Sequence, residues 1–153
     1  MITVRQFERR DVRQLLALMR ALAGYEGYLD DFAPGEDDLI THGLGAEPKF
    51  AALVATRHDD RILEGMAVTY QIDWTYDLRP KVVLKELFVR KQARGNGTGR
   101  ALMAAVFARA RAVHASQVIW TVMKGNRQAV AFYESLGACA DPKWDGWCMK
   151  LDG

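Results

Sequence analysis

The sequence predicts an α/β fold in which one mixed, mostly antiparallel β-sheet is flanked by helices. Three observations support this class. Residues 82–107 read as a strand, a basic glycine-rich turn and a helix, in that order. Residues 50–72 read as two strands joined by a polar turn at 58–60, which is the pattern of an antiparallel hairpin. Apolar residues between 12 and 22 recur at helical spacing, which indicates a helix that packs one face inward.

The first part of the chain supplies a strand and two helices. Residues 2–7 alternate as a strand does. The helix after them is expected to end at Gly24, and the segment 25–35 reads as a loop rich in tyrosine and acidic residues. Residues 36–44 read as a short helix that ends among glycines. The apolar face of the first helix consists of Val12, Leu15, Leu16, Met19 and Leu22.

The middle of the chain supplies the hairpin and the strand that enters the glycine-rich turn. The hairpin strands are expected at 50–56 and 61–72, and an aromatic loop follows at 73–80. A further strand covers 82–89, and the turn after it leads into a helix over about 97–113. The apolar side of that helix carries Leu102, Val106 and Ala110.

The last part of the chain reads as a strand, a helix and a closing segment. The strand is expected at 117–122. The helix covers 126–136, with Asn126 as a possible cap and Gly137 as its end. The tail through 144–151 is expected to form one or two closing strands.

Composition predicts one domain, 1–153, with a proper core. Half of the 153 residues are apolar, and the net charge of +2 argues against non-specific nucleic-acid binding. There is no apolar signal-peptide core and no apolar run of membrane length. Neither Cys139 and Cys148 nor the scattered histidines show metal-ligand spacing. We therefore expect a cytoplasmic protein that has no metal and no membrane or nucleic-acid partner.

Charge is unevenly distributed along the chain. Residues 79–111 hold nine Lys or Arg and a single acid, Glu86, whereas residues 21–48 hold seven acids and no Lys or Arg. One segment thus suits an anion and the other a cation. Two solvated faces that only add to solubility would give the same pattern.

The glycine-rich turn indicates a phosphate-bearing ligand. Glycines at alternate positions let backbone N–H groups approach a ligand without a Cβ in the way. The N-terminus of the following helix points its dipole and its unpaired N–H groups at the same place. Arginines at both ends add charge. The turn consists of Arg94, Gly95, Asn96, Gly97, Thr98, Gly99 and Arg100.

The spacing of this turn excludes two common phosphate motifs. A dinucleotide fingerprint needs G-x-G-x-x-G, and its third glycine position holds Arg100 or Leu102 here. A P-loop needs a Lys-Ser/Thr pair after its last glycine, and Arg100-Ala101 follows instead. The run R-G-N-G-T-G matches the pattern Arg/Gln-x-x-Gly-x-Gly/Ala. In this it resembles the pyrophosphate-binding turn of the GCN5-related N-acetyltransferases (GNAT), which bind acetyl-CoA.

A second signature extends the resemblance to the whole chain. Residues 125–138, GNRQAVAFYESLGA, are similar to the asparagine, Phe-Tyr helix and Leu-Gly-Ala sequence that this family shows after its fifth strand. The chain further resembles the diamine (spermidine/spermine) acetyltransferase branch. The shared features are Leu-Ala-Gly-Tyr-Glu at 22–26, the acidic stretch after it, Tyr76-Asp77, the strand end Glu-Leu-Phe-Val and the closing Gly-Trp.

The resemblance implies the GNAT acyl-CoA N-acyltransferase fold and a set of acetyl-CoA-binding residues. The strand before the turn is expected to splay from its neighbour and to pair its main chain with the pantetheine arm. An N–H near Phe88 or Val89 would stabilise the oxyanion. Asn126 has an alternative role as a helix cap, and Arg100 as a solvated residue. The implied contacts are Leu87, Phe88, Val89, the whole turn from Arg94 to Arg100, Asn126 and Phe132.

The resemblance implies two catalytic residues, Glu86 and Tyr133. The attacking amine must lose a proton, since a free alkylamine has a pKa near ~10. Glu86 is the candidate base, acting through water, and its alternative role is as a charge partner of Lys85 or Arg90. Polyamine acetyltransferases tend to show two acids here, and Lys85 replaces one. Strand alternation would send Lys85 and Glu86 to opposite faces. Tyr133 matches the family's general acid, and ordinary core packing is its alternative.

The expected acceptor site combines acid and aromatic residues. Tyr25, Glu26, Trp74 and Tyr76 are the candidate substrate-binding residues, and Tyr28 could join the aromatic wall of an amine pocket. Ordinary packing or a dimer surface would explain each aromatic residue equally well.

These patterns together predict an N-acetyltransferase that moves the acetyl group of acetyl-CoA to a primary amine by direct attack in a ternary complex. The expected acceptor is a small cation: a polyamine, a diamine or a diamino acid. Relatives in this branch are commonly dimers, so a homodimer is expected. The alternatives are a protein or peptide N-acetyltransferase, and a non-catalytic acyl-CoA-binding regulatory module.

Overall fold

The computed structural model describes residues 1–152. Residues 1–121 form one compact unit, which holds the sheet and three of the α-helices, and the chain from Val122 onward forms a second. Up to the last helix the order of elements follows the sequence-based expectation, with short 3₁₀ turns added between several of them.

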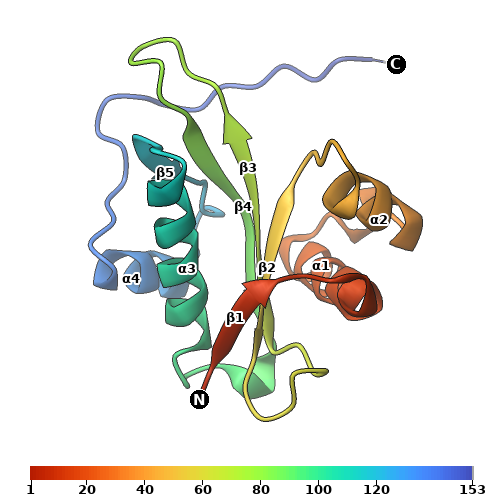
Figure 1. The fold of residues 1–153 in the computed structure, drawn as a ribbon. Coiled ribbons are helices and arrows are strands. Elements are labelled where there is room, and N and C mark those ends of the chain that lie inside the picture. The colour runs from red at the N-terminus through yellow and green to blue at the C-terminus, as the bar shows by residue number, and fades with distance from the viewer. Residues whose placement is uncertain (153) are drawn as a thin grey trace. The chain divides into compact units, whose positions relative to one another are not determined.

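The sheet of the first unit has five strands in the order β1-β2-β3-β4-β5 (Figure 1). The first four pair antiparallel, and β5 joins β4 in parallel. This confirms the predicted mixed, mostly antiparallel sheet and its hairpin. The strands are β1 Thr3–Gln6, β2 Ala51–Thr56, β3 Gly65–Ile72, β4 Lys81–Val89 and β5 Gln117–Ile119.

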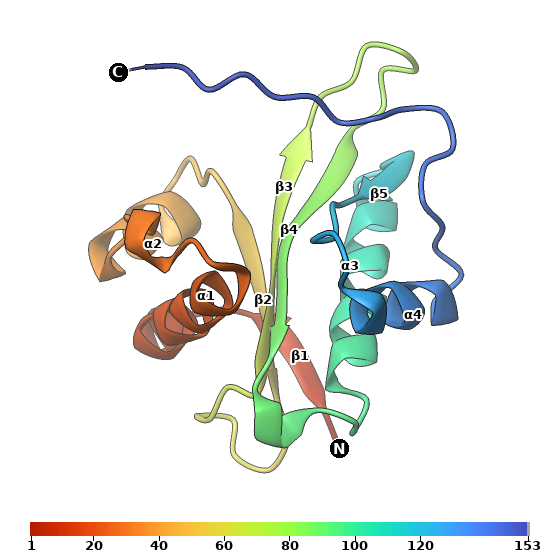
Figure 2. The same ribbon diagram turned by 180° about the vertical axis from the view of Figure 1, so that it is seen from behind.

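Helices cover both faces of this sheet (Figures 1 and 2). On one face lie α1, Val12–Glu26, and α2, Glu36–Leu44, and on the other lies α3, Thr98–Ala112. The apolar side predicted for α3 is buried, because Leu102 and Val106 are fully covered. The α1 side of the sheet is therefore one packing layer and the α3 side another.

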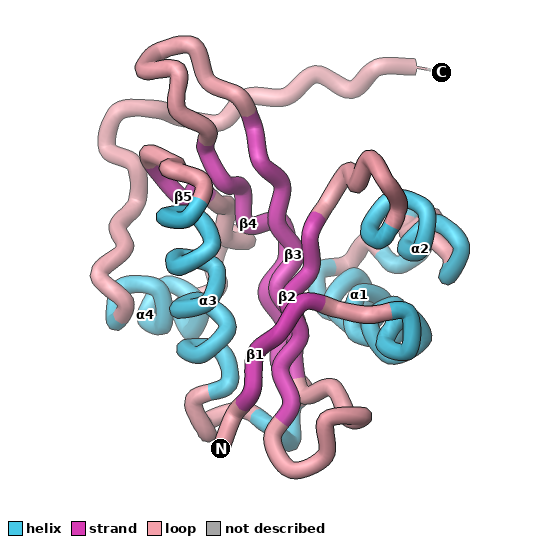
Figure 3. The backbone as a smooth tube through the Cα atoms, viewed as in Figure 1, coloured by secondary structure: helices cyan, strands magenta, loops and turns pink. Residues whose placement is uncertain are grey.

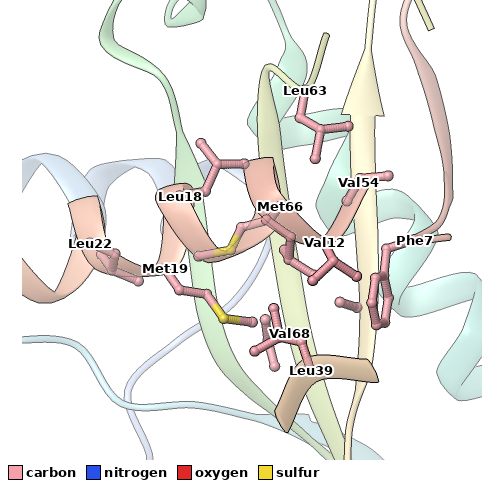
Figure 4. Packing of buried hydrophobic residues seen from close by; sticks show 12 residues of the cluster. Phe7, Val12, Leu18, Met19, Leu22, Leu39, Val54, Leu63, Met66 and Val68 are labelled. Carbon is pink, nitrogen blue, oxygen red and sulfur yellow. The ribbon is translucent and has the colours of Figure 1, made fainter. Parts of the chain in front are cut away.

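The main core lies between α1 and the sheet (Figure 4). Leu18 and Met19 of α1 pack with Met66 and Val68 of β3 in this layer. Burying a leucine-sized side chain stabilises the fold by about 1.5–3 kcal/mol. This core therefore fixes α1 on the strands that lead to the candidate site.

The first helix is longer than the sequence suggests. Gly24 lies inside α1, and the helix ends at Gly27, whose φ of 84° is left-handed. A C-cap in this conformation favours glycine, and Gly27, not Gly24, adopts it. Tyr25 and Glu26 consequently belong to the last turn of α1 and not to the expected loop. The next segment includes a 3₁₀ turn at Leu29–Asp31.

A β-bulge interrupts the pairing of β3 with β4. Val68 stands opposite Glu86, whereas the next residue, Thr69, stands opposite Leu84, so Lys85 is an additional residue in β4. Such a bulge leaves two residues of one strand facing one of its partner. The regular alternation of side chains therefore breaks at this point.

The second unit contains α4, Arg127–Ser135, and the C-terminal tail. Asn126 caps α4 by accepting a hydrogen bond from the Ala129 N–H at 3.1 Å. The prediction of closing strands is wrong, because residues 138–152 contain no strand or helix (Figure 3). A strand needs a neighbour to share its backbone hydrogen bonds, and the described tail has no ladder with another strand.

Candidate active site

The glycine-rich turn has the backbone that a phosphate-binding turn requires. After a 3₁₀ turn at Lys91–Ala93, Gly95 and Gly97 adopt left-handed φ values of 78° and 87°. An added Cβ on Gly95 would meet nothing within 4 Å, so this side of the turn is open. Thr98 begins α3 directly after Gly97, and the unpaired N–H groups of the first helical turn belong to this segment.

Three side chains hold the turn in place, and two of them were not predicted from the sequence. Arg57 donates to the Asn96 carbonyl at 3.0 Å and pairs with Glu64 at 3.4 Å. The Thr98 hydroxyl, which is buried, donates to Glu64 at 3.2 Å. The backbone N–H of Thr98 therefore remains available to a ligand, whereas its hydroxyl holds the turn to Glu64. Arg57 and Glu64 lie far from the turn in sequence, and no motif marks them.

Arg94 is also tied to the protein. Its Nε donates to the Val89 carbonyl at 2.9 Å, and its guanidinium lies 5.5 Å from the centre of the Phe88 ring. Arg94 thus links the turn to the end of β4. Its predicted role beside the phosphates, like that of Arg100, Asn96 and Gly99, stays a prediction.

β4 has an open edge where the pantetheine contacts are predicted. β5 pairs only with Lys81–Val83, so no described strand pairs with the rest of β4 on that side. Arg90 donates its backbone N–H to the Glu64 backbone carbonyl at 2.8 Å. Because peptide groups alternate in an antiparallel ladder, those of Leu87 and Val89 point away from β3. Their N–H and C=O groups therefore face the open edge, whereas those of Phe88 face β3.

Glu86 lies on the α1 side of the sheet. It stands opposite Val68, a member of the core under α1, and opposite residues of an antiparallel pair point to the same face. Its Oε2 atom is buried and has no hydrogen-bond partner among the described residues. Burial raises the pKa of the Glu86 carboxyl, the Lys85 ammonium opposes the rise, and Glu26 adds to it. A raised pKa makes the ionised form of this carboxyl a stronger base than an ordinary glutamate, which suits it to accept a proton.

The expectation that Lys85 and Glu86 point to opposite faces is wrong. The bulge at Lys85 breaks the alternation on which that expectation depended. The Lys85 Nζ lies 5.9 Å from the centre of the Tyr28 ring, and Tyr28 follows α1. Both charges therefore occupy the α1 side of β4.

Two tyrosines complete this group of residues. The Tyr28 hydroxyl is buried and, like Glu86 Oε2, has no hydrogen-bond partner among the described residues. Burial and then the charge of Glu86 raise the pKa of both Tyr28 and Tyr70. Tyr70 was not predicted, although its position on β3, two residues beyond Val68, could have indicated it. We call Tyr28, Tyr70, Lys85 and Glu86 the bulge cluster.

Of the residues predicted to bind the acceptor, the structure links only some to Glu86. Glu26, in the last turn of α1, influences both Glu86 and Tyr28 through its charge. Tyr25, beside it, is 60% exposed. Trp74 lies with the Lys81 Nζ 3.9 Å from its ring centre, and Tyr76 is 89% exposed. No interaction of the described residues joins Trp74 or Tyr76 to Glu86.

The remaining predicted residues belong to the second unit. Asn126 is the N-cap of α4, which confirms its structural role. The Phe132 and Tyr133 rings meet at a centroid distance of 5.3 Å with a tilt of 58°. The acetyl-CoA contacts of Asn126 and Phe132, and the general-acid role of Tyr133, stay predictions.

Three structural findings bear on other kinds of site. In residues 1–152, no three His, Cys, Asp or Glu side chains gather as a metal site would require. Both cysteines of this part are free and exposed. No helix in the described part of the chain has the length and apolarity needed to span a membrane.

Known proteins share both the sequence pattern and the fold. Residues 13–138 match the acetyltransferase (GNAT) family. The thialysine N-epsilon-acetyltransferase of Sus scrofa is 28% identical over 152 residues, which are 95% of this chain and 89% of that protein. The spermidine/spermine N(1)-acetyltransferase-like protein 1 of Homo sapiens is also 28% identical, over 94% of this chain and 21% of its own length.

Solved structures show the same fold at lower identity. An aminoglycoside acetyltransferase from an uncultured soil metagenomic sample, crystallised with trehalose, superposes with a TM-score of 0.81 and 17% identity. The alignment covers 99% of this chain and 97% of that one.

Proposed function

This chain belongs to the acetyltransferase (GNAT) family, and we propose that it transfers the acetyl group of acetyl-CoA to a primary amine of a small substrate: a polyamine, a diamine or a diamino acid. The bulge cluster carries this proposal. It combines a buried carboxylate oxygen on β4, the strand whose edge is open toward a ligand, with a buried tyrosine hydroxyl from the segment after α1, and neither has a hydrogen-bond partner among the described residues. The thialysine and spermidine/spermine relatives support the choice of a small amine.

Two parts of the chain fit acetyl-CoA. The turn offers open backbone beside left-handed Gly95 and Gly97, together with the first N–H groups of α3. The open edge of β4 offers the N–H groups of Leu87 and Val89 and the C=O group of Leu87, which suit the amides of a pantetheine arm, whereas the Val89 carbonyl already accepts a hydrogen bond from Arg94. When bound, acetyl-CoA supplies the acetyl group as a reactive thioester.

The residues of this chain would then carry out three tasks. Glu86 accepts a proton from the amine, directly or through a water molecule, because its raised pKa makes its carboxylate a stronger base. The N–H groups at the β4 edge stabilise negative charge on the reacting carbonyl oxygen. Tyr133 donates a proton to the departing sulfur. Acetyl transfer thus forms one amide and releases one free thiol.

A protein or peptide acceptor is the second candidate function. The exposure of Tyr25 and Tyr76 would allow a larger partner to approach. The buried, unpaired groups of the bulge cluster favour a small amine, since a compact polar site leaves few groups for a peptide backbone to pair with. A non-catalytic acyl-CoA-binding module would leave the raised pKa of Glu86 without a use.

An acceptor panel tests the proposal. The full chain is incubated with acetyl-CoA and one amine at a time, and free thiol is measured. The amines are polyamines, diamines, lysine analogues, aminoglycosides and peptides with free N-termini. We expect turnover with a small amine and little with peptides. Binding of acetyl-CoA without thiol release from any amine would favour the non-catalytic module, and turnover with peptides alone would favour the second candidate.

A further inference from the structure

Lys85 stands where the acceptor amine is proposed to react. The bulge in β4 keeps it on the same side of the sheet as Glu86, and its ammonium lies 5.9 Å from the Tyr28 ring centre. Its influence on the Glu86 carboxyl shows that the two charges interact. The site therefore contains a cation of the protein's own.

This ammonium is close enough to influence Glu86 but makes no direct ion pair. Lys85 forms no ion pair with a carboxylate of residues 1–152. Its side chain is exposed, whereas Glu86 Oε2 and the Tyr28 hydroxyl are buried. The cluster thus has a buried carboxylate oxygen and a buried hydroxyl, and on its exposed side, which we call its mouth, a cation that makes no ion pair within residues 1–152.

Such an arrangement discriminates between acceptors. An amine that reaches Glu86 places the rest of its molecule near Lys85. A second ammonium there meets a like charge, which is unfavourable, whereas a carboxylate there forms a charge-assisted pair. Specificity of this kind combines attraction for one ligand with repulsion of another.

We propose that Lys85 is a specificity-determining residue that binds the carboxylate of an amino acid acceptor and disfavours polyamines. This rests on the proposed function and narrows its acceptor to an aminocarboxylic acid. The reacting amine lies toward Glu86 and Tyr28, and the carboxylate of the acceptor lies at the mouth beside Lys85. The acetylated product retains that carboxylate.

Matched acceptor pairs test this inference. L-lysine and cadaverine differ only in the carboxylate, as do L-ornithine and putrescine, and kcat/KM is measured for each by thiol release. We expect the wild-type chain to prefer the amino acid of each pair by about tenfold or more. Lys85→Met should bring the ratio close to one, and Lys85→Glu should reverse it. Lys91→Met, which removes an exposed lysine outside the bulge cluster, should leave the ratio unchanged.

A second readout separates a specificity role from a structural one. Lys85 opposes the rise in the pKa of Glu86, while Glu26 adds to it, and Tyr28 and Tyr70 face the same carboxyl. Lys85→Met should therefore move the acidic limb of the kcat/KM profile to higher pH. Thermal melting checks that the variants fold, which is expected because Lys85 is exposed.

Each result has a definite meaning. A wild-type preference for the diamines, or a ratio that Lys85→Met leaves unchanged, would overturn the inference while the proposed function stands. Turnover with aminoglycosides but with neither L-lysine nor L-ornithine would also overturn the inference about Lys85 and leave the proposed acetyl transfer standing. Absence of thiol release with every amine would overturn both. An amino acid preference that Lys85→Glu reverses supports both.

Discussion

The Thr98 hydroxyl donates a hydrogen bond to the Glu64 carboxylate at 3.2 Å, which joins the first residue of α3 to the residue that precedes β3. Arg57 completes the link, since it contacts both Glu64 and the Asn96 carbonyl. The glycine-rich turn is thus positioned by side chains of the β2–β3 hairpin. Glycine gives the turn its shape, and this network keeps the shape in one place.

Removing Arg57 should weaken acetyl-CoA binding more than it slows turnover. Arg57→Ala deletes the donor to Asn96, so the turn loses its fixed position, and the KM for acetyl-CoA should rise several-fold with kcat nearly unchanged. Arg57→Lys keeps the positive charge but loses the planar guanidinium with its several donors. Its KM for acetyl-CoA should therefore lie between those of wild type and Arg57→Ala. Steady-state kinetics with acetyl-CoA varied decides this. A change in kcat alone would show that the network serves another purpose.

A side chain at Gly97 should damage both the turn and the fold slightly. The φ of 87° is left-handed, so Gly97→Ala should cost about 1–2 kcal/mol of unfolding free energy. The added Cβ would lie 3.8 Å from Ile2 in ordinary contact, so the chain should still fold. A bulkier Gly97→Val should abolish acetyl-CoA binding in calorimetry. Retained affinity in a folded Gly97→Val variant would remove the turn from the binding site.

Replacing Glu86 should slow turnover and stabilise the protein. In the folded chain burial raises the pKa of this carboxyl above the ordinary value of 4.5, so ionising it costs folding free energy. Below the ordinary value both states are protonated and the cost vanishes; it grows as pH rises through the raised folded pKa. The Tm of Glu86→Gln should therefore be higher than that of wild type at pH 8 and equal to it at pH 3–4. Its kcat should be much lower, because the proposed base is lost. Denaturant unfolding across this range measures the difference, and a Gln variant that is less stable at pH 8 would contradict it.

The cap and ligand roles of Asn126 can be separated. Asn126→Ala removes the acceptor for the Ala129 N–H and should cost about 1 kcal/mol, or about 2–4 °C in Tm. Asn126→Asp keeps a capping oxygen and should restore most of that stability. If the amide also donates to acetyl-CoA, the Asp variant binds acetyl-CoA more weakly although it is stable. If Asn126→Asp and the wild-type chain bind acetyl-CoA with equal affinity, capping α4 is the only role of Asn126.

Tyr133→Phe should lower kcat with little change in acetyl-CoA affinity. The substitution removes the phenolic hydroxyl, which we propose protonates the departing sulfur, and leaves the ring that meets Phe132. Pre-steady-state measurement of thiol release isolates the chemical step. As a control, Phe132→Leu should change stability more than the chemical step. Unchanged turnover in Tyr133→Phe would remove this tyrosine from the mechanism.

The sequence was sufficient to predict those features of the fold that depend on residues close together in the chain. The order of the elements, the hairpin, the buried side of α3 and the cap at Asn126 all follow from periodicity and turn chemistry. The end of α1 was missed because two glycines compete for the cap within a few residues. Only the three-dimensional structure shows that Gly27, and not Gly24, has the left-handed φ.

The missed parts of the site depend on contacts between distant segments. Arg57 and Glu64 act on a turn more than 30 residues later, as the separations of 39 and 34 residues in their hydrogen bonds to Asn96 and Thr98 show. The bulge at Lys85 is a property of the β3–β4 pairing and not of β4 alone. The closing strands expected through 144–151 are absent because the tail has no strand ladder in the described chain.

The bulge in β4 also has a consequence for how such a site can change through mutation. Leu84 on one side and Glu86 on the other keep their partners on β3, so Lys85 is an added position with no partner of its own in the ladder. Its exposure means that a new side chain there disturbs no core contact. If residue 85 were deleted, Leu84 and Glu86 would become neighbours in the strand, and their side chains would point to opposite faces of the sheet as in a regular strand. Evolution or a protein engineer can thus vary or delete the charge at the mouth of this site without replacing Glu86 itself, and each such change also alters the Glu86 pKa.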